Sequence, residues 1–250
     1  MANPSRFYLS HMHAKTGYRA TWDPTKLLKI GSVGKLEHGV LNVYTSLDKE
    51  GVPLEISSNN FGAAMDYTSH ESVSISTKLS GAVPKIGSTL SEFDAGFTLN
   101  FRGDNGVVFQ TSNHKVHQLI NLAEIEDLVL AKYDKGNWDK EWVIVTEIIE
   151  ADAATIIISN SNNGVLELKA DTSIAAQNLT LTDVKLGLSV VYEKGSTLKY
   201  LSQHSITPLY RVMGLRSAFL SNLSISNKGR PDLEVIRERL AILEYSEMEA

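Results

Sequence analysis

Two stretches of this 250-residue chain alternate apolar and polar side chains so regularly that each is expected to form a β-strand with one wet face. The first runs from Glu71 to Leu79 and the second from Phe93 to Phe101. Between them, glycines and a proline break the pattern, so the two strands are expected to form a hairpin with a small-residue tip. The apolar faces carry Val73, Ile75, Thr77 and Leu79 in the first strand and Phe93, Ala95, Phe97, Leu99 and Phe101 in the second.

The remaining strand signals point to further hairpins. Residues 141–149 (EWVIVTEII) are apolar almost without interruption, which predicts a central strand buried on both faces. Residues 160–164 (NSNNG) have the composition of a turn, and Val184, Leu186, Leu188, Val190 and Tyr192 alternate again. Strands are therefore expected at 107–110, 141–149, 155–159, 165–170, 184–192 and 197–202.

Two segments have helical spacing instead. Apolar residues between Asn113 and Lys132 recur at intervals of three and four, which predicts one amphipathic helix that ends near Gly136. Residues 221–230 are rich in Ser, Asn, Gly and Lys and are expected to be a linker. After Pro231, a short helix is predicted by the spacing of Leu233, Ile236, Leu240 and Leu243.

These elements predict an α+β fold with a twisted, mainly antiparallel β-sheet, long hairpins, flanking helices and a short C-terminal helix. Residues 1–220 are expected to form the main domain, 221–230 the linker and 231–250 a C-terminal helix and tail.

Composition excludes several classes of function. The chain has no cysteine, so disulfides, thiolate catalysis and cysteine-based metal sites are excluded. Its net charge of −5 argues against broad nucleic-acid binding. Residues 1–10 lack the apolar core of a signal peptide, and no stretch approaches the apolar length of a transmembrane helix. We expect a protein made in the cytoplasm.

No catalytic centre can be read from the sequence. The motifs GxSxG, Walker A, GxGxxG and HExxH are all missing, so neither a catalytic residue, a metal nor a cofactor is predicted, and the chain is not expected to be an enzyme. Glu147 is expected to pair with a cation such as Lys169 or Lys185. The remaining histidines and tryptophans are expected at ordinary surface or core positions. The alternatives are a metal-binding histidine pair on a strand (His11 and His13), a second histidine pair on the predicted helix (His114 and His117), and an aromatic stacking platform (Trp138 and Trp142).

The two ends of the chain differ in charge. The charged residues among the first 40 are mostly basic, and those among the last 20 are mostly acidic. This is either ordinary surface charge, or an acidic tail that masks a basic surface able to meet anionic lipid. The basic residues are Arg6, Lys15, Arg19, Lys26, Lys29 and Lys35, and the acidic ones are Asp232, Glu234, Glu238, Glu244, Glu247 and Glu249.

A helix, the strand at 141–149, a polar-tipped hairpin and the turn 194–198 (KGSTL) resemble, in this order, the N-terminal pore-forming domain of gasdermins. The hairpin from Ser72 to Phe101 resembles the first extension hairpin of that family, and 155–192 the second. The resemblance covers most of residues 5–215 by pattern and order, with near-literal matches only at Val-Thr-Glu and Gly-Ser-Thr-Leu. The size and short C-terminal segment look like bacterial or fungal members, although the N-terminal cysteine that bacterial members often lipidate is missing.

The resemblance implies an autoinhibited pore-forming protein. Proteolytic release of the short C-terminal segment would let it oligomerise and permeabilise membranes, in cell death or in anti-phage or incompatibility defence. The implied partners are further copies of the chain, a membrane of anionic composition, and an activating protease, with no nucleic acid and no cofactor. It would be cytoplasmic when inactive and at the membrane when activated.

The resemblance also assigns roles to residues. The membrane-inserting residues would be Val73, Ile75, Leu79, Phe93, Phe97, Leu99, Phe101, Val184, Leu186, Leu188 and Val190. The lipid-binding basic residues would be Arg6, Lys15, Arg19, Lys26 and Lys29. The autoinhibitory contact would be made by Leu233, Ile236, Leu240 and Leu243, with cleavage at Lys228 or Arg230.

Two other functions remain open. Alternation of this kind occurs in any half-buried antiparallel sheet, so a soluble β-rich binding module fits the same pattern. An enzyme of unfamiliar type would need a pocket with a cluster of ionisable groups.

The C-terminal helix is either a detachable latch or simply the last element of the fold.

Overall fold

Long antiparallel strands dominate the computed structural model, which describes residues 4–24, 26–60, 62–103, 105–171, 179–220 and 235–243. The helical elements are α1 (Pro4–Thr16), α2 (Leu122–Asp134) and the 3-10 turn η1 (Val184–Leu186). The strands are β1 (Arg19–Ala20), β2 (Ser32–Glu37), β3 (Val40–Ser46), β4 (Ile56–Asn60), β5 (Met65–Asp66), β6 (Val73–Lys78), β7 (Gly96–Phe101), β8 (Gly106–Leu119), β9 (Val143–Ser159), β10 (Gly164–Lys169), β11 (Ser189–Lys194), β12 (Thr197–Leu220) and β13 (Val235–Ile242).

The strands form two sheets. In the main sheet the order is β1-β12-β9-β2-β3, with β13 added to β12, β8 added to β9, and β4 and β5 added to β8. The second sheet has the order β11-β10-β7-β6, and the pairings in both sheets are antiparallel. The predicted α+β class with a mainly antiparallel sheet is confirmed.

Strand β9 is the centre of the main sheet, as its apolar run predicted. Ile144 packs into the cluster beneath α2, while Val143 and Val145 pack into a cluster on the opposite side. The two strands expected at 141–149 and 155–159 are one 17-residue strand. They are continuous because Ala151, Ala153 and Ala154 also pair with both β8 and β12.

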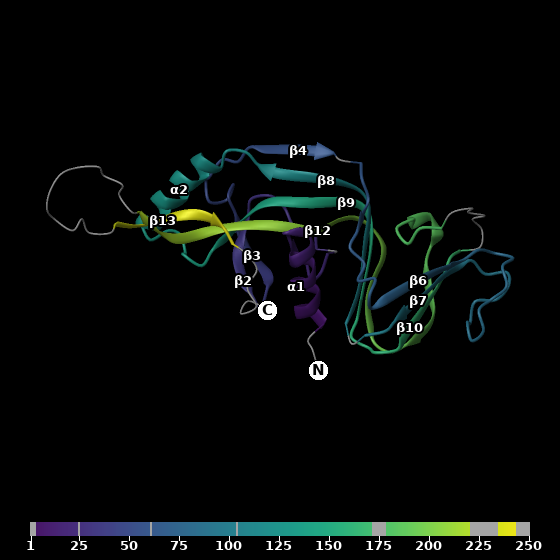
Figure 1. Ribbon diagram of the computed structural model, residues 1–250. Coiled ribbons are helices and arrows are strands. Elements are labelled where there is room, and N and C mark those ends of the chain that lie inside the picture. Colours follow the sequence, from purple (N-terminus) through teal and green to yellow (C-terminus); the bar gives the residue numbers. More distant parts are fainter. Residues whose placement is uncertain are drawn as a thin grey trace.

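The far ends of β8 and β9 are covered on both faces. Val107 and Phe109 of β8 pack with Tyr8, Leu9 and Met12 of α1. On the other face, Val108 and Ile157 pack against the second sheet, in a cluster that contains Phe97, Leu99, Leu166 and Leu168. Figure 1 shows this arrangement, with the long strands bending at one end and the second sheet lying beside them.

Each strand of the second sheet continues along the chain into a strand of the main sheet. The connections are residues 67–72 between β5 and β6, 102–105 between β7 and β8, 160–163 between β9 and β10, and 195–196 between β11 and β12. The last is the tightest: Gly195 has φ +103°, and a Cβ there would lie 2.6 Å from the side chain of Ser161. The second sheet is thus the folded-back end of the main one (Figure 1).

The helix predicted over 113–132 begins too early. Strand β8 runs on to Leu119, where Lys115, Val116 and His117 pair with β9, and α2 starts only at Leu122. Strand pairing on both sides of β8, with β4 from Lys115 to Leu119 and with β9 from His114 to Gln118, outweighs the helical spacing because it satisfies the backbone groups of this segment in the sheet. The consequence is that His114 and His117 lie on a strand, on opposite faces.

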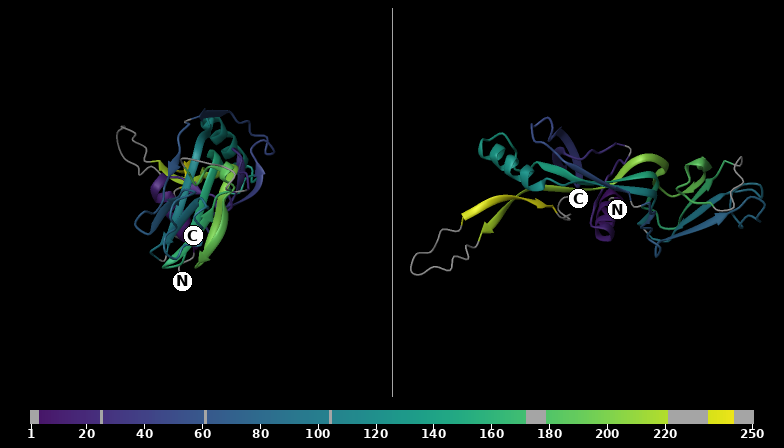
Figure 2. Two further views of the ribbon diagram at one scale, coloured as in Figure 1. Left: turned by 90° about the vertical axis from the view of Figure 1, so that its right-hand side faces the viewer. Right: turned by 90° about the horizontal axis from the view of Figure 1, so that it is seen from above.

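The predicted C-terminal helix is wrong for the described part of that segment. Residues Val235–Ile242 form β13, which pairs with β12 from Met213 to Leu220. Because a strand alternates its side chains, Leu240 packs into the cluster beneath α2 while Leu243 packs into the opposite one. Figure 2 shows β12 and β13 extending together as a ribbon from the body of the protein.

One alternative and two smaller expectations also fail. His11 and His13 lie on helix α1 instead of a strand, so two residues apart they point in nearly opposite directions. Residues 184–186 form a 3-10 turn that ends at Gly187, whose φ of +53° delays the strand until Ser189. Phe93 precedes β7, which begins at Gly96, and its side chain is 78% exposed.

The packing of the second sheet on β8 and β9 predicts a large cost for cavities. Leu99 is fully buried between the sheets, so Leu99→Ala should lower the free energy of unfolding by about 3 kcal/mol, measured by urea denaturation. The neighbouring Asn100→Ala is the control, since Asn100 lies on the other face, and it should change that free energy by less than about 0.5 kcal/mol. Equal small effects would mean that the sheets are not packed together.

Candidate functional site

The second sheet places most of the predicted membrane-inserting residues on its inner face. Val73, Phe97, Leu99 and Phe101 are at most 3% exposed and face β8 and β9. In the second half, Leu186 is buried in the same cluster and Leu188 packs against it, while Val184 is partly buried in η1 and Ile75 packs at the edge. Val190 differs, because it lies on β11 and is 41% exposed.

Residues 79–95, which we call the strap, join β6 to β7 and carry apolar side chains to the surface. Val83 is 88% exposed and Ile86 is completely exposed, and Phe93 and Leu79 are exposed as well. Of these four strap residues, the sequence pattern predicts Leu79 and Phe93 as membrane-inserting residues but not Val83 and Ile86. The signal that would have found them is the presence of large apolar residues within a segment broken by Gly81, Pro84 and Gly87.

The strap is tied down on the outer, polar face of the second sheet. Lys85 Nζ lies 2.7 Å from Ser76 Oγ, and Lys78 Nζ donates to the carbonyl oxygens of Glu92 and Asp94. At its end, Asp94 forms an ion pair with Lys169 at 2.5 Å. The hydrogen bond from Lys169, followed by those from Ser91, lowers the pKa of Asp94 to about 2. A cavity of about 300 Å³ remains between the strap and the sheet.

The predicted basic residues do not form one exposed set. Arg6 and Lys15 are exposed on α1, and Lys26 and Lys29 are exposed on the loop that follows β1. Arg19 is only 3% exposed, and its guanidinium donates to the carbonyl oxygen of Leu243 at 3.1 Å. Arg19 is therefore part of the fold and not of a lipid-binding surface, because β1 pairs with the inner strand β12.

The C-terminal contact is an edge strand. Leu240 donates its backbone N–H to Glu126 of α2 at 3.2 Å, and Leu243 donates to the carbonyl of Val212. Two exposed arginines, Arg216 on β12 and Arg239 on β13, stand directly opposite each other, a pairing that destabilises a ladder. Ile236 pairs with Phe219 through the backbone. Leu233, Lys228 and Arg230 lie outside the described residues.

The histidines and tryptophans do not build a metal or stacking site. His114 Nδ1 lies 2.7 Å from the carbonyl oxygen of Ala63. His117 bridges Ser58 (2.7 Å from Nδ1) and Glu150 (3.0 Å from Nε2) across three neighbouring strands. In a serine-hydrolase triad the serine contacts Nε2 of the histidine and the carboxylate contacts Nδ1, whereas here the serine contacts Nδ1 and the carboxylate contacts Nε2. We therefore interpret this network as a connection between strands. Trp138 is buried against Trp142 in the cluster beneath α2, as expected for core residues.

Within the described ranges, no three histidine, aspartate or glutamate side chains come together as metal ligands. In the same residues, no helix has the length and apolarity that crossing a bilayer requires.

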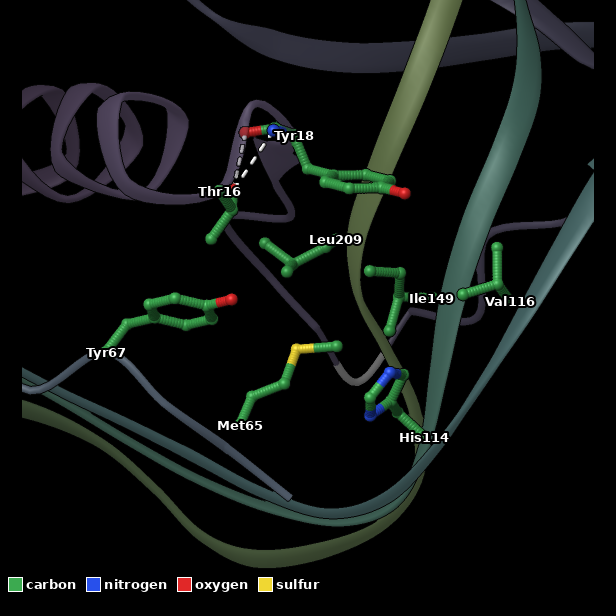
Figure 3. A pocket seen from close by; sticks show the side chains of 8 residues that line it. All are labelled: Thr16, Tyr18, Met65, Tyr67, His114, Val116, Ile149 and Leu209. Carbon is green, nitrogen blue, oxygen red and sulfur yellow. Dashed lines mark hydrogen bonds between the residues drawn. The ribbon is translucent and has the colours of Figure 1, made fainter. Parts of the chain in front are cut away.

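A small cavity lies between α1 and the concave side of the main sheet. It has a volume of about 250 Å³, and Figure 3 shows its lining residues, with Met65, Ile149 and Leu209 giving it an apolar centre. At its edge, the Tyr18 hydroxyl donates to the carboxylate of Glu147, which also pairs with Arg211 at 3.1 Å. The cation that Glu147 holds is thus Arg211, and not Lys169 or Lys185 as predicted.

The Tyr18–Glu147 contact predicts how stability depends on alkaline pH. Burial, together with the hydrogen bond to Glu147, raises the pKa of Tyr18 from 10.0 to about 12. A raised folded-state pKa contributes stability that is present below the unfolded value and is lost as pH rises from about 10 to about 12. Tyr18→Phe should remove this part of the alkaline loss, measured as the free energy of unfolding against pH. An unchanged pH dependence in the variant would contradict it.

Comparisons with known proteins add little beyond this. No family model matches the chain, and no curated protein matches it. Among solved structures, the chain is similar to the cryo-EM structure of the gasdermin A3 membrane pore, with 14% sequence identity over 92% of this chain and 96% of that chain and a TM-score of 0.34. A similarity at this identity and TM-score establishes no function.

Proposed function

We propose that this chain is a gasdermin-like pore-forming protein that changes from a water-soluble form to an oligomer in the membrane. The observation that supports it is the connectivity of the second sheet. Each of its four strands runs into a strand of the main sheet through a connection of six residues or fewer. Straightening these connections turns the folded-back sheet into the ends of two long hairpins, 65–119 and 143–220.

The lengths suit a bilayer only in the extended form. A spanning β-strand needs about 9 to 11 residues, whereas β6 and β7 have six each. Adding residues of the strap and of the connections supplies the difference. The inner face that now packs on β8 and β9, with Phe97, Leu99 and Phe101, then faces lipid, and neighbouring copies pair the outer strands so that no backbone group is left unsatisfied.

First contact with the membrane falls to exposed residues. Lys15, Lys26 and Lys29 are exposed cations, and each basic residue near an anionic surface contributes about 1 kcal/mol. Val83 and Ile86 of the strap supply apolar side chains that need no rearrangement to enter the interface. We therefore propose an anionic membrane as the partner.

The C-terminal segment is proposed as the restraint, in the form of edge strand β13 instead of a helix. It covers the side of β12 that a neighbouring copy would otherwise approach. The opposed Arg216 and Arg239 weaken its pairing, so that cutting the chain at Lys228 or Arg230 leaves a strand held mainly by its backbone ladder and a few leucines. A role in cell death or in anti-phage or incompatibility defence, as in bacterial or fungal gasdermins, belongs to this proposal.

The test is release of a fluorescent dye from vesicles that contain anionic lipid. The intact chain should release little dye. Chain treated briefly with trypsin, or truncated after Lys228, should release most of it at the same protein concentration. No release by any trimmed form, while the trimmed protein keeps its circular dichroism spectrum, would overturn the proposal.

A variant pair tests the strap in the same assay. Because Val83 and Ile86 are exposed, replacing both with serine should leave the unfolding free energy within about 0.5 kcal/mol of the original. Losing two side chains that enter lipid should raise the protein concentration for half-maximal release at least tenfold, roughly. Ile120→Ser, which removes an exposed apolar residue outside the strap, is the control and should leave release unchanged.

A soluble binding module is the second candidate, and edge strand β11 favours it. Val190, Val191 and Tyr192 are each about 40% exposed on a strand that, among the described residues, pairs only with β10, so that a partner strand could add there. This function predicts the same elution volume in size exclusion with and without anionic vesicles, whereas the pore-forming function predicts co-elution with them.

A further inference from the structure

Glu167 is a buried carboxylate on a sheet face that should be wet. It lies on β10 opposite Thr98 of β7, and Thr98 in turn pairs with Ser76 of β6. Its neighbours Leu166 and Leu168 point inward to the apolar cluster, so Glu167 points to the outer face. That face is polar, yet Glu167 is only 2% exposed.

The strap is what covers Glu167. The backbone N–H of Thr89 donates to Glu167 Oε2 at 2.7 Å, and the Thr89 hydroxyl donates to the same oxygen at 2.5 Å. From the sheet itself, the hydroxyl of Thr98 lies 3.4 Å from Oε1. Leu90, the next residue of the strap, is itself only 1% exposed.

The carboxylate is held in its charged form by these contacts. Burial acts to raise the pKa of Glu167, but the hydrogen bonds from Ser88, Thr89 and Thr98 outweigh burial and leave the pKa below its ordinary value. The strap is also fastened by Lys85 with Ser76, by Lys78 with the carbonyl oxygens of Glu92 and Asp94, and by Asp94 with Lys169. Glu167 holds the strap at Thr89, between these contacts.

The strap cannot keep this contact and also lengthen the hairpin. Each backbone N–H donates once, and that of Thr89 is given to Glu167 instead of to a neighbouring strand. Extending β6 and β7 beyond their six residues needs the amides of the strap for pairing. Val83 and Ile86 of the strap are exposed while Lys85 and Thr89 bind the sheet, so burial of these two apolar side chains in lipid would compete with the polar contacts that hold the strap.

We propose that Glu167 is a latch that keeps the strap folded on the second sheet, and that release of Thr89 from this carboxylate precedes extension of the first hairpin. The second half of this statement depends on the proposed pore-forming function. The first half concerns the protein in solution and does not depend on it.

The test uses the full-length chain with Glu167→Ala, which removes the acceptor, and Glu167→Gln, which keeps one carbonyl acceptor. The matched control is Glu193→Ala on β11 of the same sheet, whose carboxylate accepts from Thr197 and Lys199 and does not touch the strap. Hydrogen exchange of the amides at 88–90 is measured in solution by mass spectrometry. Dye release from anionic vesicles is then measured after the same trypsin treatment.

We expect the amides at 88–90 to exchange at least tenfold faster in Glu167→Ala, by an intermediate factor in Glu167→Gln, and at the original rate in Glu193→Ala. Dye release by trypsin-treated Glu167→Ala should need several-fold less protein than release by the treated original chain or the control. Should Glu167→Ala fail to fold, the Glu167→Gln variant decides the same question.

Each other outcome has a definite meaning. Unchanged exchange at 88–90 overturns the latch, whatever happens on vesicles. Faster exchange with an unchanged protein requirement for dye release overturns its role in extension. If no form releases dye, including the trypsin-treated original chain, the pore-forming function is overturned, and the role of Glu167 in extension with it. The hydrogen-exchange rates still decide whether Glu167 holds the strap.

Discussion

The packing of the second sheet against the back of β8 and β9 is the contact on which the rest of this structure depends. Val108 and Ile157 face it from the main sheet, and Phe97, Leu99 and Leu166 face it from the second. Burying side chains of this kind contributes about 1.5 to 3 kcal/mol each. Without this contact, the bends at the four connections would leave the apolar inner face of the second sheet in water.

The same contact is non-directional, and this makes it exchangeable. Hydrophobic burial needs only that the apolar face leave water, and a hydrocarbon layer meets that condition as well as β8 and β9 do. The contacts that oppose replacement of this protein–protein packing by lipid are polar contacts of the strap and the backbone pairing of β13. The strap is fastened by Lys85, Asp94 and Glu167, and β13 occupies the edge of β12. The structure thus combines a large non-directional contact with a few specific polar ones, and in the proposed function the polar contacts control its release.

Much of the fold could be predicted from the sequence, because period-2 alternation reports directly on a face. Strands β6, β7, β9 and β10, the turn at 160–163 and the burial of Phe97, Leu99 and Phe101 all follow from that pattern. Prediction from sequence spacing failed where pairing with a distant strand determines the secondary structure. Residues 113–119 and 235–242 have helical spacing, yet each lies beside an available strand edge, and sheet pairing satisfied their backbone groups.

The candidate site was predictable only in part, for a different reason. Alternation locates the inner face of the second sheet, but it does not reveal that 79–95 folds over the outer face. Glu167 looks like an ordinary solvent-facing residue of a strand, and its burial arises from contacts with a segment about 80 residues earlier, at Thr89. The prediction that Arg19 binds lipid fails for the same reason, since its burial depends on contacts with β12 and Leu243.

The most direct test of the account is the distance between the strap and α2. The chain has no cysteine, so Ile86→Cys and Asp127→Cys, both at exposed positions, allow two spin labels to be placed and their separation measured by double electron–electron resonance. If the second sheet unfolds into longer hairpins, the mean distance in the trypsin-treated protein should lengthen by about 20 Å or more on anionic vesicles, since six strand residues span about 20 Å. An unchanged distance on vesicles that nevertheless release their dye would contradict it.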